Sequence, residues 1–596
     1  MDMKTEMTVA GYLKSRMEEL GIAYMFGVAG NYTAPLLDTI LSDTNSPIKI
    51  INNSNEITAG FAADGYARVK GKPSAVYVTY SVGPFTGLNT IAGSFVEKVP
   101  ILMINGAPTN KEDSNEKNVG LLYSHTTGYE FIDIHMFRPI TVAAERITNA
   151  AQAPYQIDSV LTALLTHSRP VYLEVTEDVW RAPCNAPEGS LSSGKGRILT
   201  VSEASKAIDA AIKLIRSRPK SIFWAGIELQ RMGLQEEFLE LLEVTNDQHA
   251  QPNERIHFVT SALGKSCISE DNPFFDGCVT LTKDQINKLV GDDGVIIGIG
   301  AWTIGKDTEN QNIRSDRTIM AAHDGVFVGS EFFPLVDLKT FIVALTEAFK
   351  TAPNLNLKGI HPALKRLALV ETSDKGMGYT PFFKELESYI KQEKDTVLVV
   401  DAGFPLIGAQ GVTIPERNGF VAQAAWLAIG YSVPAATGIK FAVPNKRVMV
   451  AVGDGAFHET CQAVAEHHAN GQNTVVFVLV NGIYGIEQYL VNPNPFRKPP
   501  VDYSDNLLDA NYSYNEIPRW NYSKIPDAMG GIGRKAGTVD ELRTILEEIR
   551  QTPHENFVVE VSIPSKDTPE VLWPHLPGAI GEDETENPNW PPESKF

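Results

Sequence analysis

Short apolar runs that alternate with helical segments constrain the fold of this 596-residue chain more than any other feature of its sequence. The first such runs occupy residues 24–28, 48–51, 75–79, 101–104 and 172–175. Apolar residues between them recur at helical spacing, beginning with Val9 and Leu13 after the candidate N-cap Thr8. Strands that alternate with helices form βαβ units, whose strands run parallel in one sheet. We therefore predict an α/β fold with doubly wound parallel sheets.

The same alternation recurs twice more, which predicts three domains. The second set of apolar runs lies at 221–225, 256–259, 295–299 and 318–321, and the third at 396–400, 447–452, 474–480 and 557–561. A chain of this length is expected to hold roughly three or four domains. We place them at 1–190, 191–365 and 366–563. The tail, 564–596, is rich in Pro, Glu and Asn, and we expect it to be extended and draped over an entrance.

Charge and cysteine content narrow the classes of function. The 52 basic and 72 acidic residues give a net charge of −20, which argues against nucleic acid or an anionic membrane as the main partner.

The four cysteines lack metal-ligand spacing and residues 1–7 lack an apolar signal-peptide core, so we expect a protein of the reducing cytoplasm. The stretch 420–439 could span a bilayer by length, but Gln423, Ser432 and Pro434 interrupt it, and we predict a buried helix instead.

The third set of strands carries a motif that is typical of a metal-bound diphosphate. The strand at 447–452 runs directly into Gly453-Asp454-Gly455-Ala456. Glycines let the backbone approach an anion, and a following helix offers free N–H groups to phosphate oxygens. Asp454 is a suitable ligand for Mg²⁺, and Asn481 follows the next strand. Because the carboxyl ends of parallel strands meet at one edge of the sheet, we expect Asp454 and Asn481 to lie close together.

Two further segments stand beside the motif from Gly453 to Asn481: Asn55-Glu56 with the run AGFAADGYAR at 59–68, and RPVYL at 169–173. Through these three segments the chain resembles the thiamine-diphosphate-dependent 2-oxo acid decarboxylases, the group of pyruvate and indolepyruvate decarboxylases. The resemblance extends over nearly the whole chain. It implies a pyrimidine-binding domain, a central Rossmann-like domain and a diphosphate-binding domain. It also implies thiamine diphosphate (ThDP) and Mg²⁺ as cofactors.

The resemblance assigns cofactor-binding roles to individual residues. Glu56 matches the glutamate that hydrogen-bonds the pyrimidine ring, and a buried carboxyl can share a proton with a ring nitrogen. Ile429 matches the bulky residue that holds the cofactor in its bent shape. The matching metal ligands are Asp454, Asn481 and the carbonyl of Ile483, and the matching diphosphate contacts are Gly453, Gly455 and Ala456.

Other matching positions belong to the substrate pocket. Glu487 corresponds to a glutamate beside the substrate carboxylate, and Ile486 to a side chain that lines the pocket. Phe404 stands where the family tends to place a small hydroxyl residue, so we expect it to reshape the pocket, and we expect a bulky or aromatic 2-oxo acid. Three nearby histidines, His458, His467 and His468, lack matching metal-ligand partners, and we expect them to pack or to face solvent.

Two departures from the family concern proton transfer. Asn31 replaces an aspartate, and Ser124 replaces the first of two successive histidines, so that only His125 remains. Loss of CO₂ does not need these groups, but protonation of the resulting enamine does. The enamine would then be protonated to an aldehyde, or it would attack a second carbonyl to give an acyloin. A catalytically silent ThDP-binding regulatory or structural subunit is the alternative from another class.

The resemblance also implies an assembly. In this family the cofactor lies between the pyrimidine domain of one subunit and the diphosphate domain of another. Glu56 and Asp454 would then act on one cofactor from different chains. We therefore expect a homodimer or a homotetramer that acts on a small 2-oxo acid.

Overall fold

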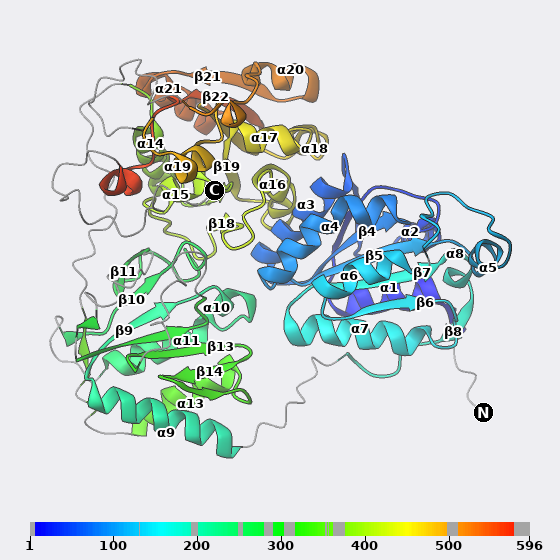
Figure 1. Cartoon of the computed structure of the whole chain (residues 1–596), viewed down its shortest axis with the longest axis horizontal. Helices are drawn as coiled ribbons and strands as arrows, with labels where there is room; N and C mark the ends of the chain where they lie inside the picture. The colour runs from blue at the N-terminus through cyan, green and yellow to red at the C-terminus, as the bar shows by residue number, and fades with distance from the viewer. Residues whose placement is uncertain are drawn as a thin grey trace, which may run out of the picture.

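The computed structural model describes residues 6–129, 131–191, 201–247, 254–278, 290–291, 293–302, 316–351, 355, 357–360, 376–496 and 511–576. These residues contain three large sheets, each built from its own part of the chain, which we call the first, second and third regions (Figure 1). The predicted three-domain α/β fold is therefore confirmed. The boundaries that we placed at 190, 365 and 563 stay predictions.

The first region is a parallel six-stranded sheet in the order β3-β2-β4-β5-β7-β6. Its strands are β2 (Tyr24–Gly27), β3 (Lys49–Asn52), β4 (Ser74–Thr79), β5 (Ile101–Ala107), β6 (Ala144–Ile147) and β7 (Val171–Thr176). Its helices are α1 (Val9–Glu19), α2 (Ala34–Ser42), α3 (Glu56–Lys70), α4 (Val82–Val96), α5 (Asn110–Val119), α6 (Ile132–Phe137), α7 (Ala153–His167) and α8 (Glu177–Trp180). A separate antiparallel pair joins β1 (Glu6–Thr8) to β8 (Pro183–Asn185). The predicted N-cap of α1 is confirmed, because the Thr8 side chain accepts a hydrogen bond from the amide of Gly11.

The second region is a mixed sheet, in which a parallel part continues into an antiparallel edge. Its strands are β9 (Lys220–Ala225), β10 (Phe258–Thr260), β11 (Phe275–Cys278), β12 (Gly294–Ile299), β13 (Thr318–Ala322), β14 (Gly325–Val328), β15 (Glu331–Phe333) and β16 (Lys358–Gly359). Its helices include α9 (Val201–Ser217), α10 (Glu228–Arg231), α11 (Gln235–Asn246) and α13 (Leu338–Thr351). Strands β13, β14 and β15 pair antiparallel, so the prediction of a purely parallel sheet is wrong at this edge.

The third region is again a parallel six-stranded sheet, in the order β18-β17-β19-β20-β22-β21. Its strands are β17 (Thr396–Val400), β18 (Phe420–Ala422), β19 (Arg447–Gly453), β20 (Val475–Val480), β21 (Ile532–Ala536) and β22 (Phe557–Ser562). Its helices are α14 (Tyr379–Gln392), α15 (Phe404–Ala409), α16 (Ser432–Ala442), α17 (Asp454–Thr460), α18 (Ala463–Ala469), α19 (Gly485–Val491), α20 (Ile525–Met529) and α21 (Val539–Gln551). Numbered along the chain within each region, the first and third sheets have the same strand order.

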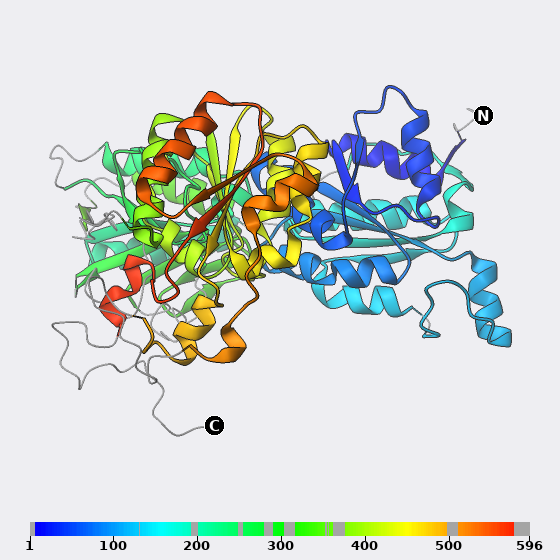
Figure 2. The ribbon, with the colours of Figure 1, turned by 90° about the horizontal axis from the view of Figure 1, so that it is seen from above.

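Helices α3 and α16 join the first region to the third. A Cβ at Gly438 would lie 1.8 Å from the carbonyl oxygen of Ala62, and one at Gly65 would lie 2.4 Å from that of Ala435. Glycine is therefore required at both positions for the helices to approach this closely. Figure 1 shows α3, in the blue part of the ribbon, next to α16, in the yellow part, and these two parts of the ribbon also meet in Figure 2.

Two expectations are corrected by the third region. Residues 420–439 are not one helix, because they form β18, an irregular loop and the first part of α16. None of the helices in the described ranges combines the length and the apolar character that a bilayer crossing needs. Residues 564–576 of the tail are not simply extended: they include a short 3₁₀ helix (Glu570–His575), and Trp573 and Leu576 belong to the core of the third region. The rest of the tail lies outside the described residues.

Candidate active site

Asp454 and Asn481 follow neighbouring parallel strands, as the sequence predicts. Strands β19 and β20 pair with Gly453 opposite Leu479, so both side chains lie at the same edge of the third sheet. The Asp454 carboxylate is buried, and it accepts hydrogen bonds from the amides of Gly455 (3.1 Å) and Gly482 (2.8 Å). Burial raises the pKa of Asp454 to about 6, while these amides counteract the rise.

Asn481 is held by its own hydrogen bonds beside Asp454. Its Nδ2 donates to the hydroxyl of Tyr379 (3.1 Å), and its Oδ1 accepts from the amide of Ile483 (3.1 Å). An amide oxygen has a second lone pair, so Oδ1 can still bind a cation. Asp454, Asn481 and the Ile483 carbonyl offer only oxygen atoms, which are the ligands that Mg²⁺ prefers.

The backbone at this edge leaves room for an anion. Nothing lies within 4 Å of the point where a Cβ at Gly453 would stand. Gly482 has a φ of +75°, a conformation that L side chains rarely adopt. The described residues contain no group of three or more His, Cys, Asp or Glu side chains that could hold a metal. A cation here would therefore depend on the Asp454 carboxylate, the Asn481 amide oxygen, the Ile483 carbonyl and the oxygens of the diphosphate itself. The residues present fit a metal-bound diphosphate.

Glu56 is the first residue of α3 in the first region. Asn55 caps this helix by accepting a hydrogen bond from the amide of Thr58 (2.8 Å). Burial raises the pKa of the Glu56 carboxyl, which favours its protonated form. Its Oε1 lies 3.3 Å from the point where a Cβ at Gly83 would stand, so the first turn of α4 borders the carboxyl.

Glu466 of α18 is a residue that the sequence did not point to. Its buried carboxylate accepts hydrogen bonds from the side chain of Asn53 (2.7 Å), the amide of Ser54 (2.8 Å) and the hydroxyl of Thr58 (2.7 Å). One side chain of the third region thus holds the loop that precedes Glu56. These partners lie more than 400 positions from Glu466 in the chain, so no local pattern could reveal the contact.

The turn that leads into α4, the helix whose first turn borders Glu56, is strained. The amide of Val82 donates to the carbonyl of Tyr80 (2.7 Å), which closes a γ-turn with Ser81 at a φ of +51°. Asp133, which is fully buried, accepts from the amide (2.7 Å) and the hydroxyl (2.8 Å) of Ser81. Such strain persists only where surrounding contacts enforce it, and Asp133 supplies those contacts here.

Ile429 lies in the loop between β18 and α16 and is 40% exposed. This exposure argues against ordinary core packing of Ile429. Asp401, at the end of β17, accepts from the amides of Gly430 (3.1 Å) and Ser432 (2.9 Å) and from the Ser432 hydroxyl (2.6 Å). A third buried carboxylate that the sequence did not point to, after Glu466 and Asp133, thus fixes the loop of Ile429.

Phe404 and Ile486 lie close to the metal ligands, and Phe404 is only 2% exposed. Its ring packs edge-on against Tyr379 (5.4 Å between centroids) and covers Gly485, where a Cβ would come within 2.6 Å of it. Ile486 lies against Gly403, just before Phe404. Glu487 follows Ile486 in α19 and is exposed.

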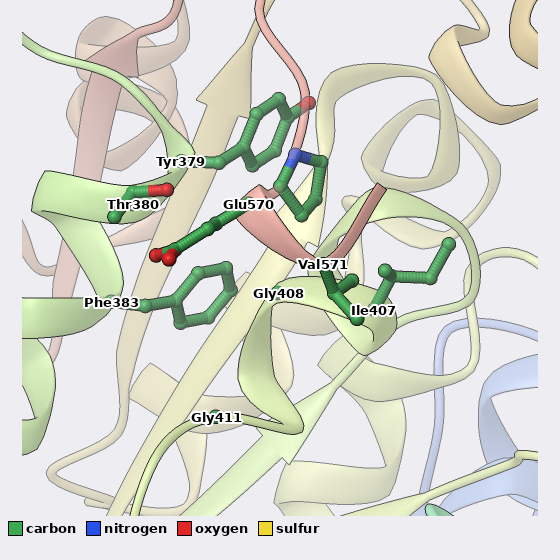
Figure 3. A pocket seen from close by; sticks show the side chains of 9 residues that line it. Tyr379, Thr380, Phe383, Ile407, Gly408, Gly411, Glu570 and Val571 are labelled. Carbon is green, nitrogen blue, oxygen red and sulfur yellow. The ribbon is translucent and has the colours of Figure 1, made fainter. Parts of the chain in front are cut away.

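Behind Tyr379 lies a small cavity of about 20 Å³ (Figure 3). Its wall includes Thr380, Phe383 and Glu570, so the 3₁₀ helix of the tail closes it. A cavity of this size has room for about one water molecule. It is therefore not the site of an organic cofactor.

Asn31, Ser124 and His125 are exposed on the first region, and His125 has a φ of +71°. Their neighbours Tyr32 and Tyr123 both contact Tyr80, with ring centroids 6.4 and 6.0 Å from it. The structure thus brings the segments of Asn31 and Ser124 to the same part of the first region. In the described part of the chain, no hydrogen bond or ion pair connects these three residues to Asp454 or Glu487.

The three histidines near the site have packing contacts, as expected. His467 is fully buried and its Nε2 lies 3.0 Å from the carbonyl of Val433. His458 stacks on Trp520 with ring centroids 3.8 Å apart. His468 lies 3.5 Å from the side chain of Asn556.

Comparison with known proteins agrees with this geometry. Residues 7–131 match the thiamine pyrophosphate enzyme N-terminal TPP binding domain, and residues 401–561 match the corresponding C-terminal TPP binding domain. A probable pyruvate decarboxylase of Schizosaccharomyces pombe is 28% identical over 595 residues, covering 96% of both chains. The chain belongs to the thiamine-diphosphate-dependent 2-oxo acid decarboxylase family. Within this family it is also similar to an alpha-keto-acid decarboxylase of Mycobacterium leprae (28% identity, covering 95% of this chain and 94% of the relative) and to a pyruvate decarboxylase of Aspergillus parasiticus (26% identity, covering 95% and 96%).

The two family matches lie in the first and third regions: the N-terminal match covers β2 to β5, and the C-terminal match begins just after β17. The N-terminal match contains Glu56, and the C-terminal match contains Asp454 and Asn481. As a member of the family, the chain therefore has its two TPP binding domains on sheets of identical strand order.

Proposed function

We propose that this chain is an enzyme that uses ThDP and Mg²⁺ to decarboxylate a 2-oxo acid. The observation that carries the proposal is the oxygen-rich edge of the third sheet, where Asp454 and Asn481 lie on neighbouring strand ends beside the open backbone of Gly453. The names of the full-length relatives support the reaction. When bound, ThDP supplies an electron sink for the loss of CO₂.

Different residues of the chain would bind the metal, exchange a proton with the cofactor and support its rings. Asp454, Asn481 and the Ile483 carbonyl would hold the metal. Glu56 would exchange a proton with a ring nitrogen of the cofactor, and its raised pKa suits this role because burial favours the protonated carboxyl. Ile429, exposed and apolar, would support the cofactor rings.

The proposal is tested by turnover and by binding in the same preparation. Protein purified with ThDP and Mg²⁺ is given pyruvate, phenylpyruvate, indolepyruvate and branched 2-oxo acids, and CO₂ release is measured. We expect at least one acid to be consumed and the Glu56→Gln variant to lose most of this activity. If ThDP binds but no acid is consumed, the chain is a silent ThDP-binding subunit instead.

A carboligase activity is the second candidate, and the residues Asn31 and Ser124 favour it. Asn31 cannot titrate and Ser124 is a poor acid, so protonation of the decarboxylated product would be slow. A slow protonation gives a second carbonyl time to react, which yields an acyloin. The test is to supply 2-oxo acids with and without an aldehyde acceptor; free aldehyde as the sole product in both cases would rule out the carboligase.

The size of the substrate is a further part of the proposal. The ring of Phe404 fills space over Gly485 next to Ile486, and both side chains are apolar. These contacts support an apolar wall, which suits a bulky or aromatic 2-oxo acid. The proposal predicts that phenylpyruvate or indolepyruvate is used with a higher kcat/KM than pyruvate.

A further inference from the structure

Arg519 lies over the loop that carries the candidate metal ligands. Its guanidinium nitrogens Nε and Nη2 lie 2.9 and 3.0 Å from the point where a Cβ at Gly482 would stand. The amide of Gly482 donates to Asp454. The guanidinium therefore lies against the backbone of the same loop whose amide holds the Asp454 carboxylate.

Backbone hydrogen bonds on one side fix the segment that carries Arg519. The amide of Ile517 donates to the carbonyl of Gly482 (3.1 Å), and the amide of Tyr484 donates to the carbonyl of Asn515 (2.8 Å). Ile483 and Glu516 form an antiparallel bridge between these two bonds. The segment is thus paired with the loop after β20, and Arg519 follows only two residues later.

Aromatic contacts on the other side hold the next residues. Trp520 stacks on His458 of α17, with centroids 3.8 Å apart and an interplanar angle of 21°. The Nε2 of His458 lies 2.9 Å from the hydroxyl of Tyr522. The backbone of Arg519 is therefore held between two anchors, so binding of a ligand does not have to order this segment of the chain.

The guanidinium has no carboxylate within ion-pair distance in the part of the chain that the structure describes, and the residue is exposed. Both oxygens of Asp454, the nearest candidate partner, accept amide hydrogen bonds from Gly455 and Gly482. An arginine on an anchored backbone segment, with free donors at the edge of an anion site, is suited to bind phosphate oxygens in bidentate fashion.

The charge balance of the site calls for such a cation. A diphosphate carries more negative charge than one divalent cation offsets, and Asp454 adds a further negative charge. The run Gly453-Asp454-Gly455-Ala456 contributes no side-chain donor of its own. Arg519 is the side chain in the described residues that lies against this loop and carries a positive charge.

We propose that Arg519 binds the diphosphate of the cofactor directly, as a second positive group beside the metal. This inference rests on the proposed function, because it presupposes that ThDP binds at Asp454 and Asn481. It makes Arg519 a cofactor-binding residue that recognises the phosphates and not the rings. Arginine is suited to this role because its planar fork matches phosphate geometry, whereas lysine offers a single point charge.

The experiment measures binding to the full-length protein by calorimetry in the presence of Mg²⁺. ThDP and inorganic pyrophosphate are titrated into the wild type, Arg519→Gln and Arg519→Lys. Loss of the charged hydrogen bonds between the guanidinium and the phosphate oxygens corresponds to an affinity for the ligand that is weaker by roughly 10- to 100-fold. We expect R519Q to weaken ThDP and pyrophosphate by the same factor in this range, because pyrophosphate carries only the phosphates, and R519K to recover part of the loss.

A matched control is Arg543→Gln, since Arg543 is an exposed arginine on α21 of the same region. It should leave both affinities unchanged, and circular dichroism and thermal unfolding should show that all variants are folded. Wild-type affinity of R519Q for both ligands would overturn the inference, as would a loss for ThDP without a loss for pyrophosphate. If the wild type itself binds no ThDP, the proposed function fails and this inference fails with it.

Discussion

At the scale of single residues, three buried carboxylates position the groups that the reaction would use. Asp401 holds the loop of Ile429, Asp133 holds the turn at Ser81, and Glu466 holds the loop before Glu56. None of the three is a candidate to contact the cofactor itself. Buried charges are costly unless they are fully hydrogen-bonded, so their presence beside the candidate site indicates that they hold loops in place.

Glu466 gives a direct test of such a positioning role. In Glu466→Gln the amide nitrogen cannot accept a hydrogen bond, so at least one of the three donors that now bind the carboxylate loses its partner. We expect kcat to fall roughly 10-fold or more, because each hydrogen bond to a charged group contributes about 1.5–3 kcal/mol. Steady-state kinetics over a range of pH would check this, and the pH profile should shift because Glu56 is displaced.

The control for that prediction is Glu547→Gln, which neutralises an exposed glutamate on α21. It should not change kcat or the pH profile. If Glu466→Gln lowered only the melting temperature and left the pH profile in place, Glu466 would be a structural residue without influence on Glu56.

Glu174 makes the stability of the first region depend on pH. Its carboxyl is fully buried, and burial raises its pKa from an ordinary value of 4.5 to about 7. The charged and titratable groups that face it are Arg146, Tyr172, Asp133 and Asp113. Because the folded-state pKa lies above the unfolded value, the contribution of Glu174 to stability is fully present below about pH 4.5 and is lost as pH rises towards 7.

Glu174→Gln removes this titration and should therefore flatten the decline of stability with pH. A shift of this size corresponds to roughly 3 kcal/mol, so the variant should gain in melting temperature over the wild type at pH 8 and not at pH 4.5. Thermal unfolding monitored by circular dichroism at several pH values is the measurement. Parallel curves for the two proteins would show that Glu174 does not titrate in this range.

At the scale of secondary-structure elements, the junction of α3 and α16 depends on two glycines. Gly438→Ala would place a Cβ 1.8 Å from the carbonyl oxygen of Ala62, so the two helices would have to move apart. We expect a loss of several kcal/mol of stability, as for other overpacked cores, measured by denaturant unfolding. Gly376→Ala is the control, because nothing lies within 4 Å of its Cβ position; equal destabilisation by both variants would contradict the prediction.

The elements also show which parts of the fold a sequence can predict. Strands such as β17 and β20 are buried along their whole length and therefore appear as continuous apolar runs. Strand β6, with the sequence AERI, and β21, with IGRKA, are mostly half-buried and carry charged residues, so no apolar run marks them. Among the candidate site residues, the sequence predicted that Asp454 and Asn481 lie close together. This was possible because each residue directly follows a strand, and the ends of neighbouring parallel strands meet at one edge of the sheet. The contacts of Glu466 could not be predicted, because they depend on tertiary packing between distant segments.

At the scale of the whole molecule, the candidate groups belong to two sheets of the same topology. Glu56 lies on α3 of the first sheet, and Asp454 lies at the edge of the third. Residues near these positions are apolar and exposed in the single chain, including Val82 (48%) at the start of α4 and Leu427 (49%) and Ile429 (40%) in the loop before α16. Exposed apolar groups of this kind are typical of a binding or assembly surface. They support the proposal that a second copy of the chain completes the site.

Complementation between two inactive variants tests this arrangement. If Glu56 of one copy and Asp454 of another act on one cofactor, a dimer of Glu56→Gln with Asp454→Ala contains one site without either substitution. Random mixing of equal amounts makes about half of the dimers mixed, so activity should recover to about a quarter of the wild-type value. For the measurement, the two variants are co-expressed with different affinity tags, and the doubly tagged fraction is assayed for CO₂ release. This fraction contains only mixed dimers, each with one intact site of two, so about half of the wild-type activity is expected. If both groups came from the same copy, every site in the mixed dimer would carry one substitution, and the doubly tagged protein would be as inactive as its parents.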